Sequence, residues 1–392
     1  MTASLGRSRA AVVFAFVVCG MMFGSWASRI PAIKEQAGLD SVQLGFALLC
    51  SAFGSILAMT SAGYLAGRIG SHKVASLMLL ASAAMLPVIA SSTSFLMLAG
   101  ALFLYGAAYG SMDVCMNANG LAIERLGTGP IMSRLHAGWS VGSFIGAVLT
   151  SIALAAGLSV FQQFTLLAGA MVLSAAILSQ TMLKEKHAAE GSVFRRPPRR
   201  LVLVGFVALC ALVSEGSAGD WSGVFIKDSI GGTAQDAALA ITFLSAAMAV
   251  ARLAGDRLTQ LLGAARLVSF GAAISALGLA MALVVAQPPA AIVGFGLLGL
   301  GVAATYPIAL RAGGSQPGIA SGVGIAAVAT MGSAGVMAAP PLIGTAAGAA
   351  GLRAALAMIV ILLLVLAATA GRALGSSQVT IREPAVRTEL LP

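Results

Sequence analysis

The chain has 392 residues, of which 59% are hydrophobic and only 9% are charged. A soluble domain carries about 25% charged residues, and this much apolar surface cannot be hidden inside one water-exposed globule. These figures exclude a soluble enzyme, a disordered protein and a secreted disulfide scaffold. The four cysteines all fall inside apolar runs, where we expect small buried hydrophobic residues and neither disulfides nor metal ligands.

Twelve apolar runs follow one another along the chain, each long enough to cross a bilayer as a helix, which takes roughly 20 residues. The runs lack period-two alternation, which favours helices over a β-barrel. We therefore predict an all-α membrane protein with twelve transmembrane helices. They cover residues 10–30, 41–66, 74–91, 95–123, 131–156, 160–182, 201–226, 236–258, 264–286, 290–311, 318–346 and 352–374.

Local sequence features give further predictions for three of these helices. Glycines at four-residue spacing in the fifth helix, such as Gly142 and Gly146, predict close packing against a neighbour. The pair Pro340-Pro341 predicts a bend or break in the eleventh helix. Glu124, next to Arg125 at the end of the fourth helix, is expected to be half of a solvated ion pair.

The basic residues set the expected orientation. The formal net charge is +10, from 23 Lys and Arg against 13 Asp and Glu. With the N-terminus in the cytoplasm, 19 of the 23 basic residues, Arg252 among them, fall on the cytoplasmic side; only Arg29, Lys34, Lys227 and Arg353 fall outside. The positive-inside rule then predicts a bacterial inner-membrane protein with both termini in the cytoplasm, and it explains the net charge without nucleic acid.

The second half of the chain repeats the first. Three fragments recur at near-equal separations, and each lands on the corresponding helix of the other half. We therefore predict two pseudo-symmetric six-helix bundles, residues 1–183 and 201–392, joined by a basic cytoplasmic linker, residues 184–200, that contacts anionic lipid. The matching fragments are Leu65-Ala66-Gly67 with Leu253-Ala254-Gly255 (188 positions), Gly110 with Gly301 (191) and Ser140–Ser143 with Thr330–Ser333 (190).

The segment from Gly63 to Lys73, between the second and third helices, resembles the cytoplasmic-loop motif of the major facilitator superfamily. Gly67 stands where that family usually has an acidic residue, but the acid is present in the second-half copy. The resemblance implies two six-helix halves that alternate access to a central site, and a loop acid that helps to latch helices on the cytoplasmic face. The residues that carry the motif are Gly63, Arg68, Gly70, Asp256 and Arg257.

Four further stretches resemble a narrower branch, the fucose-permease-like sugar transporters, which includes rhizobial rhizopine-transport proteins. The resemblance implies a sugar, a polyol or an amino-polyol such as a rhizopine as substrate. The stretches are Trp26–Pro31, Asp113–Asn119, His136–Ser140 and Glu215–Ser222.

Ionisable groups inside the predicted helices are the candidate functional residues, because each costs at least about 2.5–3.5 kcal/mol in hydrocarbon. Glu215, near the middle of the seventh helix, and Asp113, with Asn117 one turn on, are candidate substrate ligands. Glu215, Asp113 and His136 are candidate proton-coupling residues, and Asp113 and His136 could approach each other. Asp113 could instead be a structural acid, and His136 an ordinary interfacial histidine.

Arg29 and Asp220 occupy equivalent places in the two halves, near the outer ends of the first and seventh helices. The hypothesis is that they form a periplasmic gate pair, made in the inward-open state and broken in the outward-open state. The alternative is that each is solvated independently.

Tryptophans provide the last candidates. Trp26 and Trp221 lie near the predicted outer interface, and Trp139 lies nearer the inner one. Interfacial anchoring is the ordinary explanation. The alternative is that all three line the cavity and pack against the apolar face of a sugar or polyol.

Several motifs are missing from the sequence. It has no GxxxxGK[ST] sequence for ATP, no metal-ligand clusters and no hydrolase elbow, so we expect no enzyme, no cofactor and no metal. The prediction is a monomeric secondary transporter of a small polar organic solute, coupled to protons. The alternatives are a proton-driven exporter of drugs or metabolites, and a membrane sensor that binds without translocation.

Overall fold

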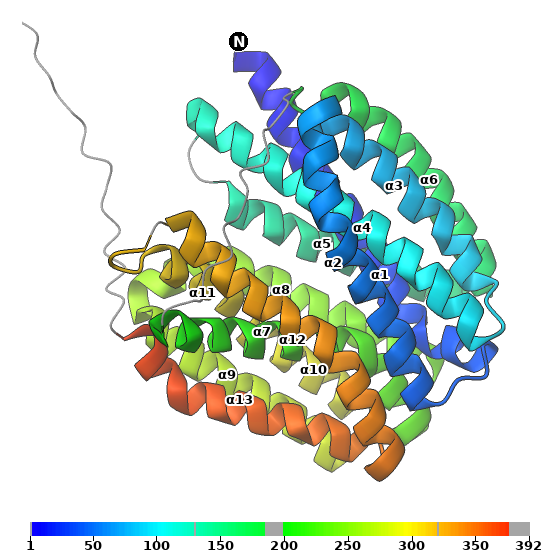
Figure 1. Cartoon of the computed structure of the whole chain (residues 1–392). Helices are drawn as coiled ribbons and strands as arrows, with labels where there is room; N and C mark the ends of the chain where they lie inside the picture. The colour runs from blue at the N-terminus through cyan, green and yellow to red at the C-terminus, as the bar shows by residue number, and fades with distance from the viewer. Residues whose placement is uncertain (1, 129–130, 185–198, 320, 376–392) are drawn as a thin grey trace, which may run out of the picture.

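The protein is described from a computed structural model that covers residues 2–128, 131–184, 199–319 and 321–375. All regular secondary structure in these residues is helical (Figure 1). The first half contains α1 (Thr2–Gln36), α2 (Ser41–Ile69), α3 (Ser71–Ala90), α4 (Phe95–Ile123), η1 (Glu124–Thr128), α5 (Met132–Ala155) and α6 (Val160–Thr181). The second half contains α7 (Arg199–Val224), η2 (Phe225–Ser229), α8 (Ala234–Leu262), α9 (Ala264–Val285), α10 (Pro288–Val302), α11 (Thr305–Gly314), α12 (Ser321–Ala350) and α13 (Leu352–Leu374).

The predicted all-α fold is confirmed, with twelve helical spans in the described residues that are long and apolar enough to cross a membrane. Most predicted ends agree with the observed ones to within a few residues, although α1 is much longer than expected. The linker predicted at 184–200 lies mostly outside the described residues, as do the basic residues Arg195 and Arg196.

Proline acts differently at two sites. The tenth span is divided into α10 and α11, because Pro307 has no N–H to donate and its ring clashes with the carbonyl of Ala303, four residues earlier. The eleventh span is not broken: α12 runs continuously through Pro340 and Pro341. The predicted break at this pair is therefore wrong, and a bend there stays a prediction.

The helix boundaries follow from the local sequence. The side chain of Asp40 caps α2 by accepting a hydrogen bond from the backbone N–H of Gln43, and the backbone N–H of Asp40 donates to the side-chain oxygen of Gln43. Thr233 and Asp236 form the equivalent box at α8. The turn between α2 and α3 requires glycine, because Gly70 has a φ of 98°.

The same pairs of helices pack together in each half. In the first half α1 packs on α5, α2 on α4 and α3 on α6; in the second half α7 packs on α12, α8 on α10 and α9 on α13. The two halves contact each other through α5 with α8 and through α2 with α12. The predicted repeat therefore has a structural counterpart in the packing.

The predicted close approach at Gly142 and Gly146 is confirmed. A Cβ atom at Gly142 would lie 2.0 Å from the carbonyl oxygen of Val17, and one at Gly146 would lie 2.2 Å from that of Met21. These distances leave no room for a side chain, so α5 lies backbone against backbone on α1.

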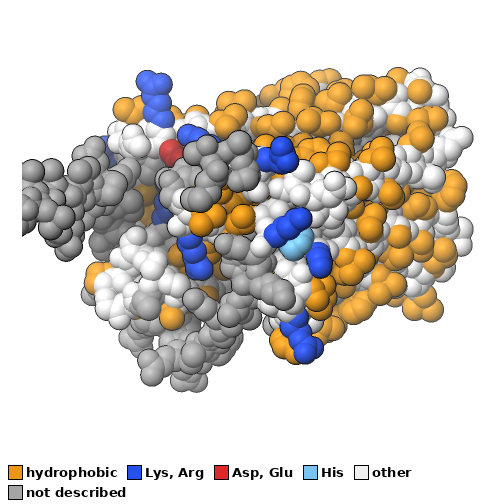
Figure 2. All heavy atoms as spheres, turned by 90° about the horizontal axis from the view of Figure 1, so that it is seen from above, with side chains coloured by type: hydrophobic (Ala, Val, Ile, Leu, Met, Phe, Trp, Pro, Cys, Tyr) orange, Lys and Arg blue, Asp and Glu red, His pale blue; other side chains and the backbone are white. Residues whose placement is uncertain are grey.

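The halves diverge toward the side of the molecule where α1 begins (Figure 1). We call this the N-terminal side, and the side where α1 ends the opposite side. Lys and Arg side chains gather over one part of the face in Figure 2, and hydrophobic side chains cover most of the remainder. Large exposed apolar side chains, such as Leu96, Leu166 and Val284, suit contact with lipid.

Candidate functional site

A cavity of about 470 Å³ lies between the two halves on the N-terminal side. We call it the central cavity. Its mouth is formed by helix ends on this side, such as those that carry Leu121 and Ile325. The first half contributes Asn117, Ala118, Leu121, Met132 and His136; the second half contributes Arg252, Gly255, Asp256, Thr259, Ala304, Tyr306, Pro307, Ile308, Leu310, Arg311 and Ile325.

Arg252 is the central polar group of this cavity. Its Nη2 donates to both carboxylate oxygens of Glu215, at 2.8 and 2.9 Å, and its Nη1 donates to the hydroxyl of Ser140 at 2.6 Å. The side chains of Arg252 and Glu215 are 10% and 17% exposed. An ion pair within the second half is thus bonded directly to α5 of the first half.

The division of the tenth span contributes to the same site. The carbonyl of Ala303, at the end of α10, accepts a bond from Nε of Arg252 at 3.5 Å. Because Pro307 has no N–H, the carbonyl of Ala303 cannot accept the usual hydrogen bond from four residues later in the helix. Tyr306, which follows the break, lines the cavity.

Trp139 provides an aromatic surface beside Arg252. The guanidinium carbon lies 5.7 Å from the centre of the indole ring, a cation–π arrangement. The indole N–H donates to the hydroxyl of Tyr109 at 3.0 Å, and that hydroxyl donates to the carbonyl of Cys19 at 3.3 Å. The ring of Phe23 packs against Trp139 at 5.0 Å. These contacts fix the plane of the indole.

Asp113 lies on α4, the neighbouring wall. The side-chain amide of Asn117 donates to its carboxylate at 3.1 Å and to its carbonyl at 2.9 Å. The described residues offer Asp113 no ion pair and no hydrogen bond to His136. The ring of His136 instead packs edge-on against Phe16, with centroids 5.4 Å apart. Asp113 and Asn117 are thus together as expected, whereas His136 is not bonded to them.

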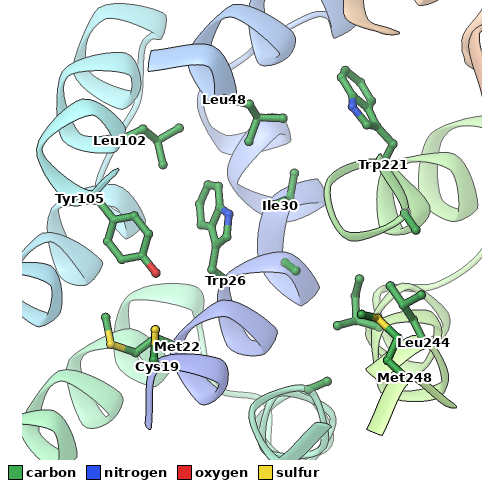
Figure 3. Packing of buried hydrophobic residues seen from close by; sticks show 14 of the residues in the cluster. Cys19, Met22, Trp26, Ile30, Leu48, Leu102, Tyr105, Trp221, Leu244 and Met248 are labelled. Carbon is green, nitrogen blue, oxygen red and sulfur yellow. The ribbon is translucent and has the colours of Figure 1, made fainter. Parts of the chain in front are cut away.

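None of the three tryptophans is among the residues that line the central cavity. Trp26 is 5% exposed and Trp221 is fully buried, and both belong to the hydrophobic core. Figure 3 shows the ring of Trp26 among Leu48, Leu102 and Tyr105, between α1, α2 and α4. The expectation of a cavity role is not supported for these two, whereas Trp139 is in contact with Arg252.

The expected pair of Arg29 and Asp220 is not formed. Arg29 donates to Oε1 of Gln163 at 2.7 Å and to the carbonyl of Leu158 at 3.0 Å, so its contacts lie within the first half. Neither these bonds nor any ion pair among the described residues involves Asp220. The physical reason is that Arg29 is buried beside the turn between α5 and α6, where the carbonyl of Leu158 and the side-chain amide oxygen of Gln163 satisfy it.

Two other ion pairs connect the halves on the opposite side. Lys34 Nζ lies 2.7 Å from Asp228 Oδ2, and Lys227 Nζ lies 3.1 Å from Glu35 Oε2. We call these the inter-half ion pairs. Lys34-Glu35 lies in the last turn of α1 and Lys227-Asp228 lies in η2. The two contacts are reciprocal, because each half contributes one lysine and one acid.

The loop-motif residues form contacts within their own halves. Asp256 bonds to Arg311 at 2.6 Å, joining α8 to α11, and this pair is half exposed. Arg68 lies over the ring of Tyr64, 5.5 Å from its centre. Within the part of the chain that the structure describes, Arg257 forms no hydrogen bond or ion pair. Among the described residues, no ion pair joins the halves on the N-terminal side.

Glu124 does not form the expected ion pair with Arg125. Its carboxylate accepts hydrogen bonds from the backbone N–H groups of Ile131 and Met132, the latter at 2.9 Å. These unpaired amides at the start of α5 attract a carboxylate, because the positive end of the helix dipole lies there. Glu124 is therefore a cap of α5.

Sequence reasoning missed Arg252 and the inter-half ion pairs. The positive-inside count places Arg252 on the cytoplasmic side, although it lies inside the apolar eighth helix, where an ionisable residue is a functional candidate. The inter-half ion pairs could have been suspected from the internal repeat, because Lys34-Glu35 and Lys227-Asp228 are similar dipeptides 193 positions apart.

Comparison with known proteins gives matches over most of the chain. The Major Facilitator Superfamily matches residues 12–225. A relative described as an uncharacterised MFS-type transporter of Yersinia pestis is 32% identical over 362 residues, which cover 91% of this chain and 93% of the relative. Membrane protein MosC of Rhizobium meliloti is 30% identical over 352 residues, with coverage of 89% and 86%.

Solved structures share the fold at low sequence identity. A mutant form of the nucleoside transporter NupG superposes with a TM-score of 0.76 at 11% identity, covering 93% of this chain and 99% of that one. A bacterial homologue of the human lysosomal transporter Spinster, described as inward-facing and unoccupied, gives a TM-score of 0.73 at 14% identity, with coverage of 95% and 97%.

Proposed function

Since this chain belongs to the major facilitator superfamily, we propose that it is a secondary transporter that carries a sugar, a polyol or an amino-polyol across the bacterial inner membrane, coupled to protons. One observation carries this proposal. Polar side chains from both halves line a single cavity, and one of them, Arg252 of α8, also bonds to Glu215 of α7 and to Ser140 of α5. A solute bound there would contact both halves at once, as alternating access requires.

The arrangement of the halves supports an inward-facing state. Positive charge favours a cytoplasmic N-terminus, so the central cavity would open to the cytoplasm. The inter-half ion pairs would then close the periplasmic side. A solute would enter or leave through the mouth around Leu121 and Ile325, and a rocking motion would expose the same site to the periplasm.

The inter-half ion pairs replace Arg29 and Asp220 as the proposed periplasmic gate. They join α1 to η2 across the two halves, whereas the bonds of Arg29 stay within one half. Opening the periplasmic side would separate both lysine–acid contacts, and the charged groups would then be solvated.

The chemistry of the site favours a polyhydroxylated solute. Amide, hydroxyl, imidazole and carboxylate groups can hydrogen-bond hydroxyl groups, and the ring of Tyr306, which lines the cavity, can pack against an apolar ring face. The structural relative NupG is described as a nucleoside transporter, and a nucleoside also combines a polar sugar with a flat ring.

Flux measurement with the purified full chain in proteoliposomes tests the proposal. Counterflow of radiolabelled sugars, polyols and amino-polyols should be saturable, and the double variant Asp113→Asn with Glu215→Gln should abolish it. The variant Asp236→Asn, at the exposed start of α8, is the matched control and should retain flux. Unchanged flux in the double variant would contradict the proposal, and binding without any flux would indicate a sensor.

Proton coupling has a separate test. Asp113 and Asp220 are carboxylates without an ion pair in the described structure, so either can serve as a proton carrier. A pH dye trapped inside the proteoliposomes should report proton movement when the transported solute is added. A uniporter would move the solute with no change in the dye signal.

A further inference from the structure

The residues that line the central cavity fall into two layers. Side chains four positions apart share one face of a helix and lie about 6 Å apart along its axis, at about 1.5 Å per residue. We call the residues deeper in the cavity the inner layer, and those one turn nearer its mouth the outer layer. On three helices the inner and outer residues are Asn117 and Leu121 of α4, His136 and Met132 of α5, and Tyr306 and Leu310 of α11.

The two layers differ in chemistry. The inner layer presents an amide, an imidazole and a phenol, and Arg252 of α8 adds a guanidinium. The outer layer is apolar on the same three helices, and Ile325, near the start of α12, extends it. The exception is Asp256, one turn beyond Arg252, but it is closed in an ion pair with Arg311 at 2.6 Å. The cavity is thus polar at depth and largely apolar toward its mouth.

The outer layer exposes apolar surface inside the cavity. Leu121 is 43% exposed and Ile325 is 40% exposed, and the two come from opposite halves. Leu104, on the same helix as Leu121, is also exposed, but it does not line the cavity. Apolar surface that is exposed within a cavity and bordered by polar groups is typical of a ligand-binding site.

A solute that is polar on every side matches only the inner layer. Hydroxyl groups placed against Leu121 or Leu310 lose their bonds to water and gain no partner, which costs free energy. A solute with an apolar group at one end instead removes this surface from water, which is favourable. The cavity volume of about 470 Å³ leaves room for both parts, since pockets of about 300–1,000 Å³ hold drug-sized ligands.

We propose that the solute is amphipathic: a hydroxylated head group bonds to the inner layer, and one apolar substituent, such as a short alkyl or an aryl group, packs against Leu121, Leu310 and Ile325. This rests on the function proposed above and narrows its substrate class from free sugars and polyols to their alkyl or aryl derivatives. The alternative is that the outer layer is apolar because its two sides pack together when the N-terminal side closes. In that case an apolar substituent gains no affinity.

Probes that share a head group and differ in their apolar substituent test this assignment. The full chain in lipid nanodiscs is titrated with glucose, galactose, ribose and inositol, and with the methyl, propyl and phenyl derivatives of each. Binding is measured from the unfolding temperature and from binding heat. Between the methyl and propyl derivatives, affinity should rise about fourfold for each methylene group, the gain expected for its burial. Derivatives that bind no more tightly than their parents would overturn the assignment.

Variants locate the effect. Leu121→Ala and Ile325→Ala shorten the outer layer from each half and should lower the ratio of propyl to methyl affinity roughly threefold. Leu104→Ala, the same truncation outside the cavity, is the matched control and should keep the ratio. Size-exclusion profiles and unfolding temperatures without solute show whether each variant is folded. A role only in closing the N-terminal side would change both affinities alike, and an unchanged ratio would therefore refute the assignment.

Flux separates this inference from the function on which it rests. Saturable counterflow of a free sugar or polyol, inhibited no better by its propyl and phenyl derivatives than by the free compound, would refute the inference while the transporter proposal stands. Absence of both binding and flux for every probe would contradict both.

Discussion

Arg252 shows how one buried cation can organise a site. Its guanidinium contacts Glu215 on α7, Ser140 and Trp139 on α5, and the carbonyl of Ala303. An ion pair removed from water gains little net stability, but the loss of one partner leaves an uncompensated charge. The pair therefore matters more for the arrangement of the site than for the stability of the fold.

The ion pair of Arg252 and Glu215 leads to a prediction about the stability of the protein. Arg252→Met should destabilise the protein by about 3 kcal/mol, because it leaves Glu215 largely buried without a cation. The double variant Arg252→Met with Glu215→Met should be less destabilised than this single variant. Thermal unfolding of the purified variants measures both; a double variant as unstable as the sum of the two single variants would show that the pair is not coupled.

Tyr109 and Tyr105 form a matched pair of probes on α4. The hydroxyl of Tyr109 holds the indole of Trp139, whereas the buried hydroxyl of Tyr105 has no hydrogen-bond partner among the described residues. Tyr109→Phe should cost about 1 kcal/mol and weaken solute binding, because the indole loses an anchor. Tyr105→Phe should be neutral or slightly stabilising in the same unfolding and binding assays. Equal effects of the two variants would contradict this account of Trp139.

Individual roles were only partly predictable from the sequence. The i, i+4 contact of Asp113 with Asn117 follows from helix geometry and was expected. The pair of Arg252 and Glu215 was not, because it depends on how α7 and α8 are rotated relative to each other. Arg29 satisfies its donors within its own half, so the symmetry that suggested a partner in Asp220 was insufficient.

At the level of helices, the packing of α1 on α5 depends on the absence of side chains. Gly20 and Gly24 of α1 lie against the carbonyl oxygens of Trp139 and Ser143, and Gly142 lies against that of Val17. This approach positions Trp139 and Ser140 toward the second half. Hydropathy predicted the helices well, since every span must be apolar, but it carried no signal for the interruption between α10 and α11.

Glycine substitutions in α5 test this packing. Gly142→Ala places a Cβ atom 2.0 Å from a backbone oxygen of α1 and should destabilise the protein by roughly 1–3 kcal/mol, because the helices must separate. At Gly138 the nearest atom would be 3.7 Å away, so Gly138→Ala is the control and should be tolerated. Thermal unfolding compares them; equal stability of the two variants would show that α1 and α5 are not packed this closely.

At the level of the whole molecule, the two sides of the bundle differ in the ion pairs that join the halves. Two reciprocal ion pairs join the halves on the opposite side, while among the described residues the ion pairs nearer the N-terminal side, Asp256 with Arg311 and Arg252 with Glu215, each lie within the second half. Exposed pairs each contribute up to about 1 kcal/mol. Two of them are enough to favour the state with the N-terminal side open without making it irreversible.

Neutralising the inter-half ion pairs tests the account most directly. In Lys34→Gln with Lys227→Gln, the population of the state with the opposite side open should rise on the order of tenfold, because both lysine–acid contacts are lost. The matched control exchanges charges instead, with Lys227→Glu and Glu35→Lys, and should keep the original balance. Spin labels on each half, in lipid nanodiscs, report the distances across both sides. The account predicts that opposite-side distances lengthen while N-terminal-side distances shorten; distances that stay unchanged on both sides would contradict it.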